Sequence, residues 1–144
     1  MPPSGFGSCG KDAGLIFDTD VLIWFFRGNA RAAREIERTP ERLVSAISVM
    51  ELYQGARSKD ELRTILQFLQ HHEFRVLPVN EAISHSAVGL MEDHALRDGL
   101  HVADALIAAT ARHTKAALLT GNVRHFRKIP RIEVRTFQAN GGGT

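Results

Sequence analysis

The stretch LIFDTDVLIWFF, residues 15–26, places two carboxylates, Asp18 and Asp20, between apolar runs. The apolar run 15–17 predicts a short buried strand, and TDVLIWFFRG, residues 19–28, predicts a helix with Thr19 or Asp20 near its N-cap. A carboxylate that follows a buried strand is costly unless a partner compensates its charge. Asp18 therefore needs a compensating partner, which it could share with other acids of the chain.

The rest of the chain continues this alternation of short apolar runs and helical patterns. Strands alternating with helices predict an α/β fold, with parallel strands joined by right-handed crossovers and helices on both faces of the sheet. The further strands are expected within residues 42–48, 74–79, 116–120 and 131–137, the helices within 30–38, 48–58, 59–72, 80–99 and 101–114, and a loop or short helix at 121–130.

Length and composition predict one soluble domain. The chain has 144 residues, of which 44% are hydrophobic and 24% charged, typical of a globular protein. We expect a folded unit over residues 14–137, a flexible lead-in over 1–13 and a flexible tail over 138–144. The longest apolar run, 21–26, is too short to cross a membrane, and the N-terminus lacks the pattern of a signal peptide. With a single cysteine, Cys9, these features predict a cytoplasmic protein.

Charge is unevenly distributed along the chain. The formal net charge is only +2, but seven basic residues and one acid, Glu133, lie from Arg112 onward. Such an excess favours a polyanionic partner near the C-terminal part of the fold. The candidates for contact with the phosphates of a nucleic acid are Arg112, Arg124, Arg127 and Lys128.

Four polar positions stand where strands lead into helices or in the first turns of helices. They are Asp18 with Asp20, Glu51, Asp104 and Asn122. Ligands bind at the carboxyl ends of parallel strands, where Asp18 and Asn122 are expected. The sequence has no Cys/His pattern of a zinc site and no glycine-rich phosphate loop. Carboxylates alone select Mg²⁺ or Mn²⁺, and such sites commonly hydrolyse phosphodiesters.

Four motifs in this order, LIFDTDVLIWFF, SAISVMELYQGA, GLHVADALIAATA and LLTGNVRHF, resemble the PIN domain. The likeness is to VapC-like ribonuclease toxins of bacterial type II toxin–antitoxin systems, and it runs from about residue 14 to residue 137. It implies a three-layer α/β/α sandwich with a central parallel sheet and an acidic pocket for Mg²⁺ or Mn²⁺. It also implies a cognate antitoxin, a homodimer and an RNA substrate.

Transferred residue by residue, the resemblance assigns the catalytic and metal-binding acids to Asp18, Glu51 and Asp104. The fourth acidic position of the family is Asn122 here, which supplies no charge and is expected to act through water or through a neighbouring ligand. The favoured hypothesis is a metal-dependent endoribonuclease that leaves 3′-hydroxyl and 5′-phosphate ends.

Two side chains next to these acids have supporting roles in this interpretation. Thr120 is expected to donate a hydrogen bond to a carboxylate of the pocket. Asp20 falls where the family varies among Asn, Ser, Thr and Asp, and we interpret it as the helix cap beside the pocket. Asp98 is interpreted as a solvated acid near a helix end.

Two alternative functions remain open at this point. The Asp-x-Asp pattern of residues 18–20 also occurs in haloacid-dehalogenase-like phosphotransferases, where Asp18 would be the nucleophile and Asp20 the general acid. The only acid after Asp104 is Glu133, which speaks against that chemistry. A non-catalytic PIN-like module that binds RNA or protein is the other alternative, and the intact acids weigh against it.

Overall fold

The structure is a computed structural model that describes residues 14–140. The predicted lead-in, with Cys9, lies outside this part of the chain. The elements in chain order are β1 (Leu15–Phe17), α1 (Thr19–Phe26), α2 (Ala30–Arg38), β2 (Arg42–Ser45), α3 (Ala46–Gln54), α4 (Lys59–His71), β3 (Arg75–Leu77), α5 (Glu81–Asp98), α6 (Val102–Thr114), β4 (Ala117–Thr120), the 3₁₀ helix η2 (Val123–His125) and β5 (Val134–Thr136).

The five strands form one parallel sheet in the order β3-β2-β1-β4-β5. Strand β1 lies in the centre, where Ile16 pairs with Leu43 of β2 and with Leu118 of β4. Because all strands run the same way, β1 and β4 end at the same edge. This edge receives Asp18 and Thr120.

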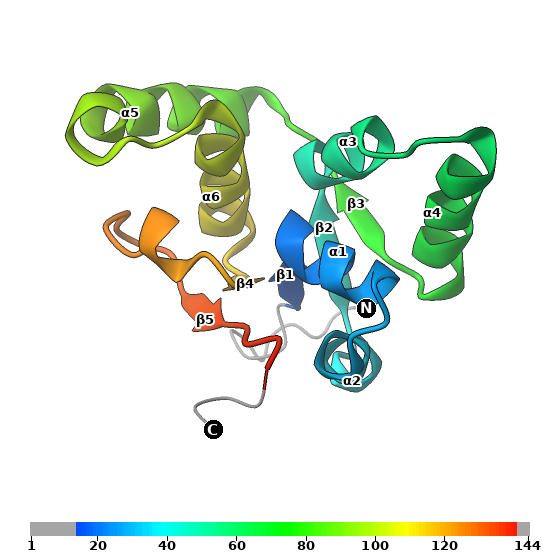
Figure 1. The fold of residues 1–144 in the computed structure, drawn as a ribbon. Helices are drawn as coiled ribbons and strands as arrows, with labels where there is room; N and C mark the ends of the chain where they lie inside the picture. Colours follow the sequence, from blue (N-terminus) through cyan, green and yellow to red (C-terminus); the bar gives the residue numbers. More distant parts are fainter. Residues whose placement is uncertain (1–13, 141–144) are drawn as a thin grey trace, which may run out of the picture.

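Helices cover both faces of the sheet, so the three-layer α/β/α architecture expected from the sequence is confirmed (Figure 1). Leu15 and Phe17 point to the face covered by α1, α2 and α4, whereas Ile16 points to the face covered by α5 and α6. The strands are buried on both sides, which is why they read as continuous apolar runs.

Helix α6 is packed closely into the fold because it consists largely of alanine. Ala105, Ala108 and Ala109 have no exposed surface. Their small side chains let the helix approach its neighbours, and Asp104 in its first turn thereby comes close to the edge where β1 and β4 end. The negative charge of Asp104 therefore acts on Asp18 and Asp20.

Two helix starts differ from the prediction. Asp18, not Asp20, is the N-cap of α1, because its Oδ1 accepts from the backbone N–H of Thr19. Helix α3 begins at Ala46, two residues before the predicted start at residue 48, with Ser45 as its N-cap. Ser48 therefore lies inside α3 and not at its beginning.

The fold continues beyond the predicted end at residue 137. Residues 138–140 are described, and the backbone carbonyl of Ala139 accepts a hydrogen bond of 3.0 Å from the Asn29 side chain. Residues 141–144 of the predicted tail lie outside the described part. No helix within residues 14–140 is long and apolar enough to span a bilayer.

Candidate active site

Asp18 lies at the centre of the site because it directly follows the central strand β1. Its backbone N–H continues the sheet by donating to the Leu119 carbonyl over 2.9 Å. Its Oδ1 accepts from the Thr19 N–H at 2.8 Å, and its Oδ2 accepts from the Thr120 hydroxyl at 2.7 Å. Only 5% of Asp18 is exposed, so burial and these two bonds hold the carboxylate in one orientation.

Thr120 joins the two sides of the site. Besides donating to Asp18, its Oγ1 accepts from the backbone N–H of Asn122 at 2.9 Å. The Asn122 side chain is exposed, and its Nδ2 lies 3.4 Å from Asp20 Oδ2. Asn122 thus contacts the acids as an amide donor and adds no negative charge.

Asp20 belongs to the acid cluster, and the interpretation of Asp20 as the cap of α1 is wrong. Its Oδ2 accepts from the backbone N–H of Gly121 at 2.9 Å. Its Oδ1 is buried and has no hydrogen-bond partner among the described residues. The side chain crosses to the loop after β4 because Asp18 already satisfies the cap position.

Asp104 approaches the same cluster from the first turn of α6. Its Oδ2 lies 3.3 Å from Nδ1 of His125, which belongs to η2. Nothing in the sequence pattern marks His125, because a histidine in a loop becomes informative only when its neighbour in space is known.

The pKa values of the three aspartates show that their carboxylates lie close enough to influence one another. Burial raises the pKa of Asp18 to about 7, and the negative charges of Asp20 and Asp104 add to this rise against the hydrogen bonds from Thr120 and Thr19. Burial also raises the pKa of Asp20 and of Asp104. The Gly121 N–H opposes the rise at Asp20, and His125 opposes it at Asp104. The residues of the cluster therefore carry too little positive charge to neutralise its three carboxylates.

Glu51 contacts Thr19, the residue between Asp18 and Asp20, and forms no hydrogen bond with an aspartate of the cluster within residues 14–140. Its Oε1 accepts from the Thr19 hydroxyl at 2.6 Å, and that hydroxyl also lies 2.8 Å from Ser48 Oγ. Glu51 lines a hollow of about 540 Å³ between α1, α3 and α4. Within residues 14–140, no three Asp, Glu, His or Cys side chains converge as closely as a metal cage requires. The structure groups Asp18 and Asp104 with Asp20, and holds Glu51 beside them through Thr19.

Three of the four predicted RNA-contacting residues line one cavity beside Asp104. Arg124, Arg127 and Lys128 border a space of about 490 Å³ between the end of α5, the start of α6 and the loop after β4. Arg112 is not with them. It lies at the other end of α6, where its Nη2 donates to the Pro130 carbonyl at 2.7 Å.

Asp98 is not the solvated acid that its sequence position suggested. Its side chain is 13% exposed and contacts three partners, because the end of α5 turns toward the loop after β4. His94 Nδ1 lies 2.7 Å from Asp98 Oδ2, Arg97 Nε lies 3.3 Å from the same oxygen, and Lys128 Nζ lies 3.4 Å from Oδ1. These hydrogen bonds, from His94 first, lower the pKa of Asp98.

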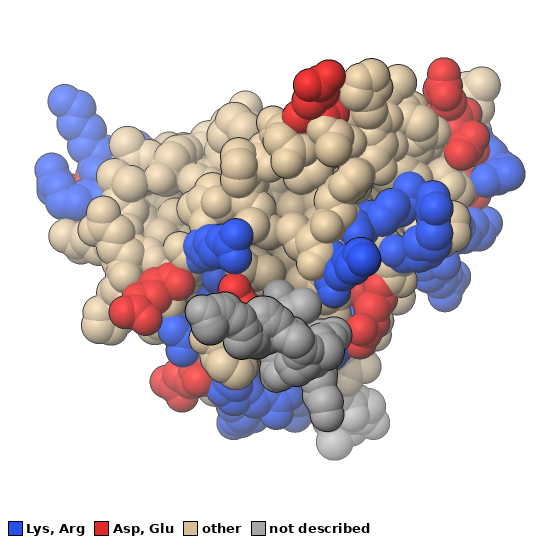
Figure 2. All heavy atoms as spheres, turned by 180° about the vertical axis from the view of Figure 1, so that it is seen from behind, with Lys and Arg blue, Asp and Glu red and all other residues tan. Residues whose placement is uncertain are grey.

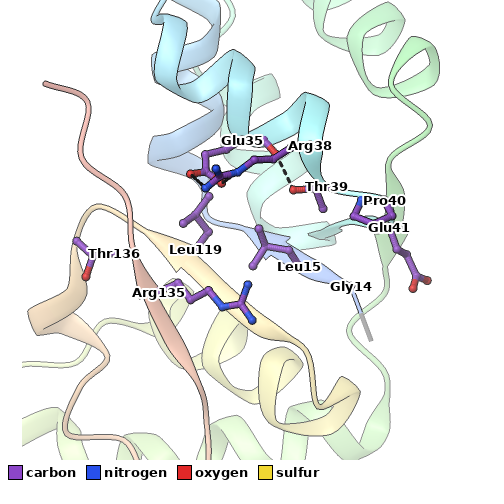
Figure 3. A pocket seen from close by; sticks show the side chains of 10 residues that line it. All are labelled: Gly14, Leu15, Glu35, Arg38, Thr39, Pro40, Glu41, Leu119, Arg135 and Thr136. Carbon is purple, nitrogen blue, oxygen red and sulfur yellow. Dashed lines mark hydrogen bonds and ion pairs between the residues drawn. The ribbon is translucent and has the colours of Figure 1, made fainter. Parts of the chain in front are cut away.

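A separate cavity of about 620 Å³ lies between the end of α2 and strands β1, β4 and β5 (Figure 3). Its charged side chains are largely paired: Arg38 binds Glu35, and Arg135 binds Glu133. It contains none of the predicted site residues.

Comparison with known proteins identifies the family. The PIN domain model matches residues 15–132. Ribonuclease VapC10 of Mycobacterium tuberculosis (strain CDC 1551 / Oshkosh) is 34% identical over 117 residues, which cover 78% of this chain and 85% of the relative. Ribonuclease VapC of Rickettsia bellii (strain RML369-C) is 32% identical over 131 residues, which cover 85% of this chain and 96% of the relative.

A solved structure supports the same assignment. A chain in a toxin–antitoxin complex from Klebsiella pneumoniae superposes with a TM-score of 0.72 at 29% identity, covering 85% of this chain and 96% of that chain. These likenesses rule out the haloacid-dehalogenase-like alternative. The chain belongs to the PIN domain family and, within it, to the VapC group.

Proposed function

We propose that this chain is the ribonuclease toxin of a type II toxin–antitoxin pair, and that it hydrolyses RNA phosphodiester bonds beside Asp18, Asp20 and Asp104. One observation carries the proposal: three carboxylates from two distant segments converge, partly buried, at the carboxyl edge of the sheet. The relatives' names, Ribonuclease VapC10 and Ribonuclease VapC, support this activity.

A divalent cation such as Mg²⁺ or Mn²⁺ fits the chemistry of this cluster. The pKa values of all three aspartates are raised, and one oxygen of Asp20 is buried without a hydrogen-bond partner among the described residues. A cation would compensate both features, and an all-oxygen donor set suits a hard ion that keeps several water ligands. Asp18, Asp20 and Asp104 are the residues that would hold it, by moving closer together than they lie in the structure, and Glu51 remains a predicted ligand that Thr19 holds nearby. When bound, such an ion activates water and offsets negative charge on a phosphate.

The surrounding residues fix the orientation of these acids. Thr120 and the Thr19 N–H hold both oxygens of Asp18, the Gly121 N–H holds Asp20, and His125 contacts Asp104. Ligands held in this way pay little reorganisation cost when substrate binds.

The nuclease activity is tested by mapping cleavage ends on total RNA with Mn²⁺ present. We expect cleavage by the intact chain, with 3′-hydroxyl and 5′-phosphate ends, and loss of cleavage in Asp18→Asn with the fold retained. Asp60→Asn is the matched control, because that carboxylate is 90% exposed on α4. Full activity of Asp18→Asn would refute the site.

The cation is tested separately by calorimetry with Mn²⁺. Binding is expected for the intact chain and not for Asp18→Asn. A non-catalytic module would instead bind RNA without cutting it, and would show no Mn²⁺ binding that depends on Asp18.

The toxin role also includes a partner. We propose that a cognate antitoxin covers the acid cluster, with an Arg or Lys entering it, and that the chain forms a homodimer. Expression of the chain alone should slow growth, and Asp104→Ala should relieve this effect. Unchanged growth with the intact chain would contradict the toxin role and leave the nuclease activity standing.

A further inference from the structure

We infer that the cavity beside Asp104 is a subsite for one nucleotide of the RNA next to the cleaved bond, and that Arg124 and Arg127 bind its phosphate. The inference rests on the proposed ribonuclease function. It adds which residues bind the substrate and on which side of the acid cluster the neighbouring nucleotide lies.

The position and size of the cavity fit this role. It measures about 490 Å³, within the usual range of small-ligand pockets, and Asp104 forms part of its wall. A strand passing the acid cluster would place a neighbouring nucleotide in this space. The rings of His101 and His125 also line the cavity and offer flat surfaces on which a base can stack.

The charges in the cavity single out two arginines. Asp98 engages two of the cations in the wall, Arg97 and Lys128, through ion pairs of 3.3 and 3.4 Å. Across residues 14–140, the side chains of Arg124 and Arg127 form no hydrogen bond or ion pair with another side chain or the backbone, and both are exposed. Their guanidinium groups can therefore bind a phosphate oxygen pair without first breaking an ion pair.

The loop that carries both arginines is anchored to the core. Phe126 is fully buried and Ile129 is 5% exposed, and both pack in the cluster beneath α5 and α6. The backbone N–H of Arg127 also donates to the Val123 carbonyl at 3.0 Å. Figure 2 shows Lys and Arg side chains spread over the rear face, with one group at its right. The arginines thus project from a fixed base, which reduces the entropy lost on binding.

The test is RNA binding by the full chain in EDTA, where divalent ions are absent. Fluorescence anisotropy with a fluorescein-labelled, single-stranded RNA octamer is recorded over a series of salt concentrations. We expect Arg124→Gln and Arg127→Gln each to weaken binding about tenfold, the scale of one charged hydrogen bond. Each substitution should also reduce the magnitude of the slope of log K against the logarithm of the salt concentration by about 0.7, the value for one phosphate contact on a single strand.

Two control variants make the same charge change elsewhere. Arg31→Gln and Arg34→Gln both lie on the exposed side of α2, away from the cavity. Both should leave the affinity and its salt dependence within about twofold of the intact chain, because a removed surface charge outside the site acts only through screened, long-range attraction.

The outcomes separate the two proposals. If Arg124→Gln and Arg127→Gln bind the octamer as tightly as the intact chain does, and the intact chain cuts RNA with Mn²⁺, only the subsite is overturned. An intact chain that neither binds the octamer nor cuts RNA would overturn both the subsite and the ribonuclease function. Equal losses of octamer affinity in all four variants would also overturn the subsite, because they would show that the RNA responds to the net charge of the protein and not to two particular arginines.

Discussion

Thr120 donates a 2.7 Å hydrogen bond to Asp18 although 102 residues separate them in the chain. Both residues are buried, and they end the neighbouring strands β4 and β1. The bond stabilises the carboxylate form of Asp18 in a place where burial disfavours it. It therefore connects the stability of the sheet edge to the charge of the candidate active site.

Replacing this hydroxyl should cost stability mainly when Asp18 is ionised. Thr120→Val keeps the side-chain shape and removes the donor, so we expect the free energy of unfolding to fall by about 1–3 kcal/mol at pH 8. The pKa of Asp18 should rise further, because the Thr120 bond lowers it. Urea unfolding at pH 8 and pH 5 measures this. An equal loss at both pH values, or the same loss in the exposed control Thr64→Val, would show that Asp18 is not involved.

Without a divalent ion, Asp18 should make the chain less stable as the pH rises. The pKa of Asp18 is about 7 in the folded chain and 3.8 ordinarily, so the folded state binds its proton more tightly. This stabilisation is fully present below pH 3.8 and is lost as the pH rises through about 7. In EDTA at pH 8, Asp18→Asn should exceed the intact chain in free energy of unfolding by on the order of 2–4 kcal/mol.

The same difference should nearly vanish near pH 3, below the ordinary pKa of 3.8, where Asp18 is mostly protonated in both the folded and the unfolded chain. Mn²⁺ should stabilise the intact chain at pH 8 and leave Asp18→Asn unchanged. A variant that is less stable than the intact chain at pH 8 in EDTA would contradict the raised pKa.

A side chain at position 121 should displace Asp20, because a Cβ there would lie 2.6 Å from Asp20 Oδ2. Gly121→Ala would force Asp20 to move and would weaken the 2.9 Å bond from the Gly121 N–H. We expect Mn²⁺ affinity and RNA cleavage to fall about 10–100-fold, as for other changes next to metal ligands.

Gly89→Ala is the matched control for that substitution. Gly89 lies within α5 and has no atom within 4 Å of the added Cβ, so alanine should stabilise the helix by about 0.5–1 kcal/mol and leave cleavage unchanged. Cleavage by Gly121→Ala at the rate of Gly89→Ala would show that the position of Asp20 is not important.

Asp98 should respond to pH in the opposite direction from Asp18. Its pKa is lowered by the bond to His94 and by Arg97 and Lys128, so its contribution to stability is present above pH 3.8 and is lost as the pH falls below that value. Asp98→Asn should lower the melting temperature at pH 7 and have less effect at pH 3. Scanning calorimetry at both pH values tests this. Glu133→Gln, which removes an exposed acid, should change neither temperature by a comparable amount.

Local patterns were sufficient to predict the elements of this fold. The strands are buried on both sides, so they appear as apolar runs, and Asn80 and Gly99 mark the two ends of α5 as cap residues do. Such patterns depend only on neighbours within a few residues, so they can be recognised without knowledge of the tertiary structure. The order of four motifs along the chain was also enough to indicate the family.

The sequence by itself thus determined the alternation of strands and helices, the parallel sheet and the placing of Asp18 and Asn122 at its carboxyl edge. Only the tertiary structure decided that Asp18 caps α1 while Asp20 reaches Gly121, that Glu51 binds Thr19, and that Arg112 lies away from Arg124 and Arg127. The physical reason is that a helix or strand forms from local periodicity, whereas a polar side chain takes whichever partner the packing of distant segments brings within hydrogen-bond distance.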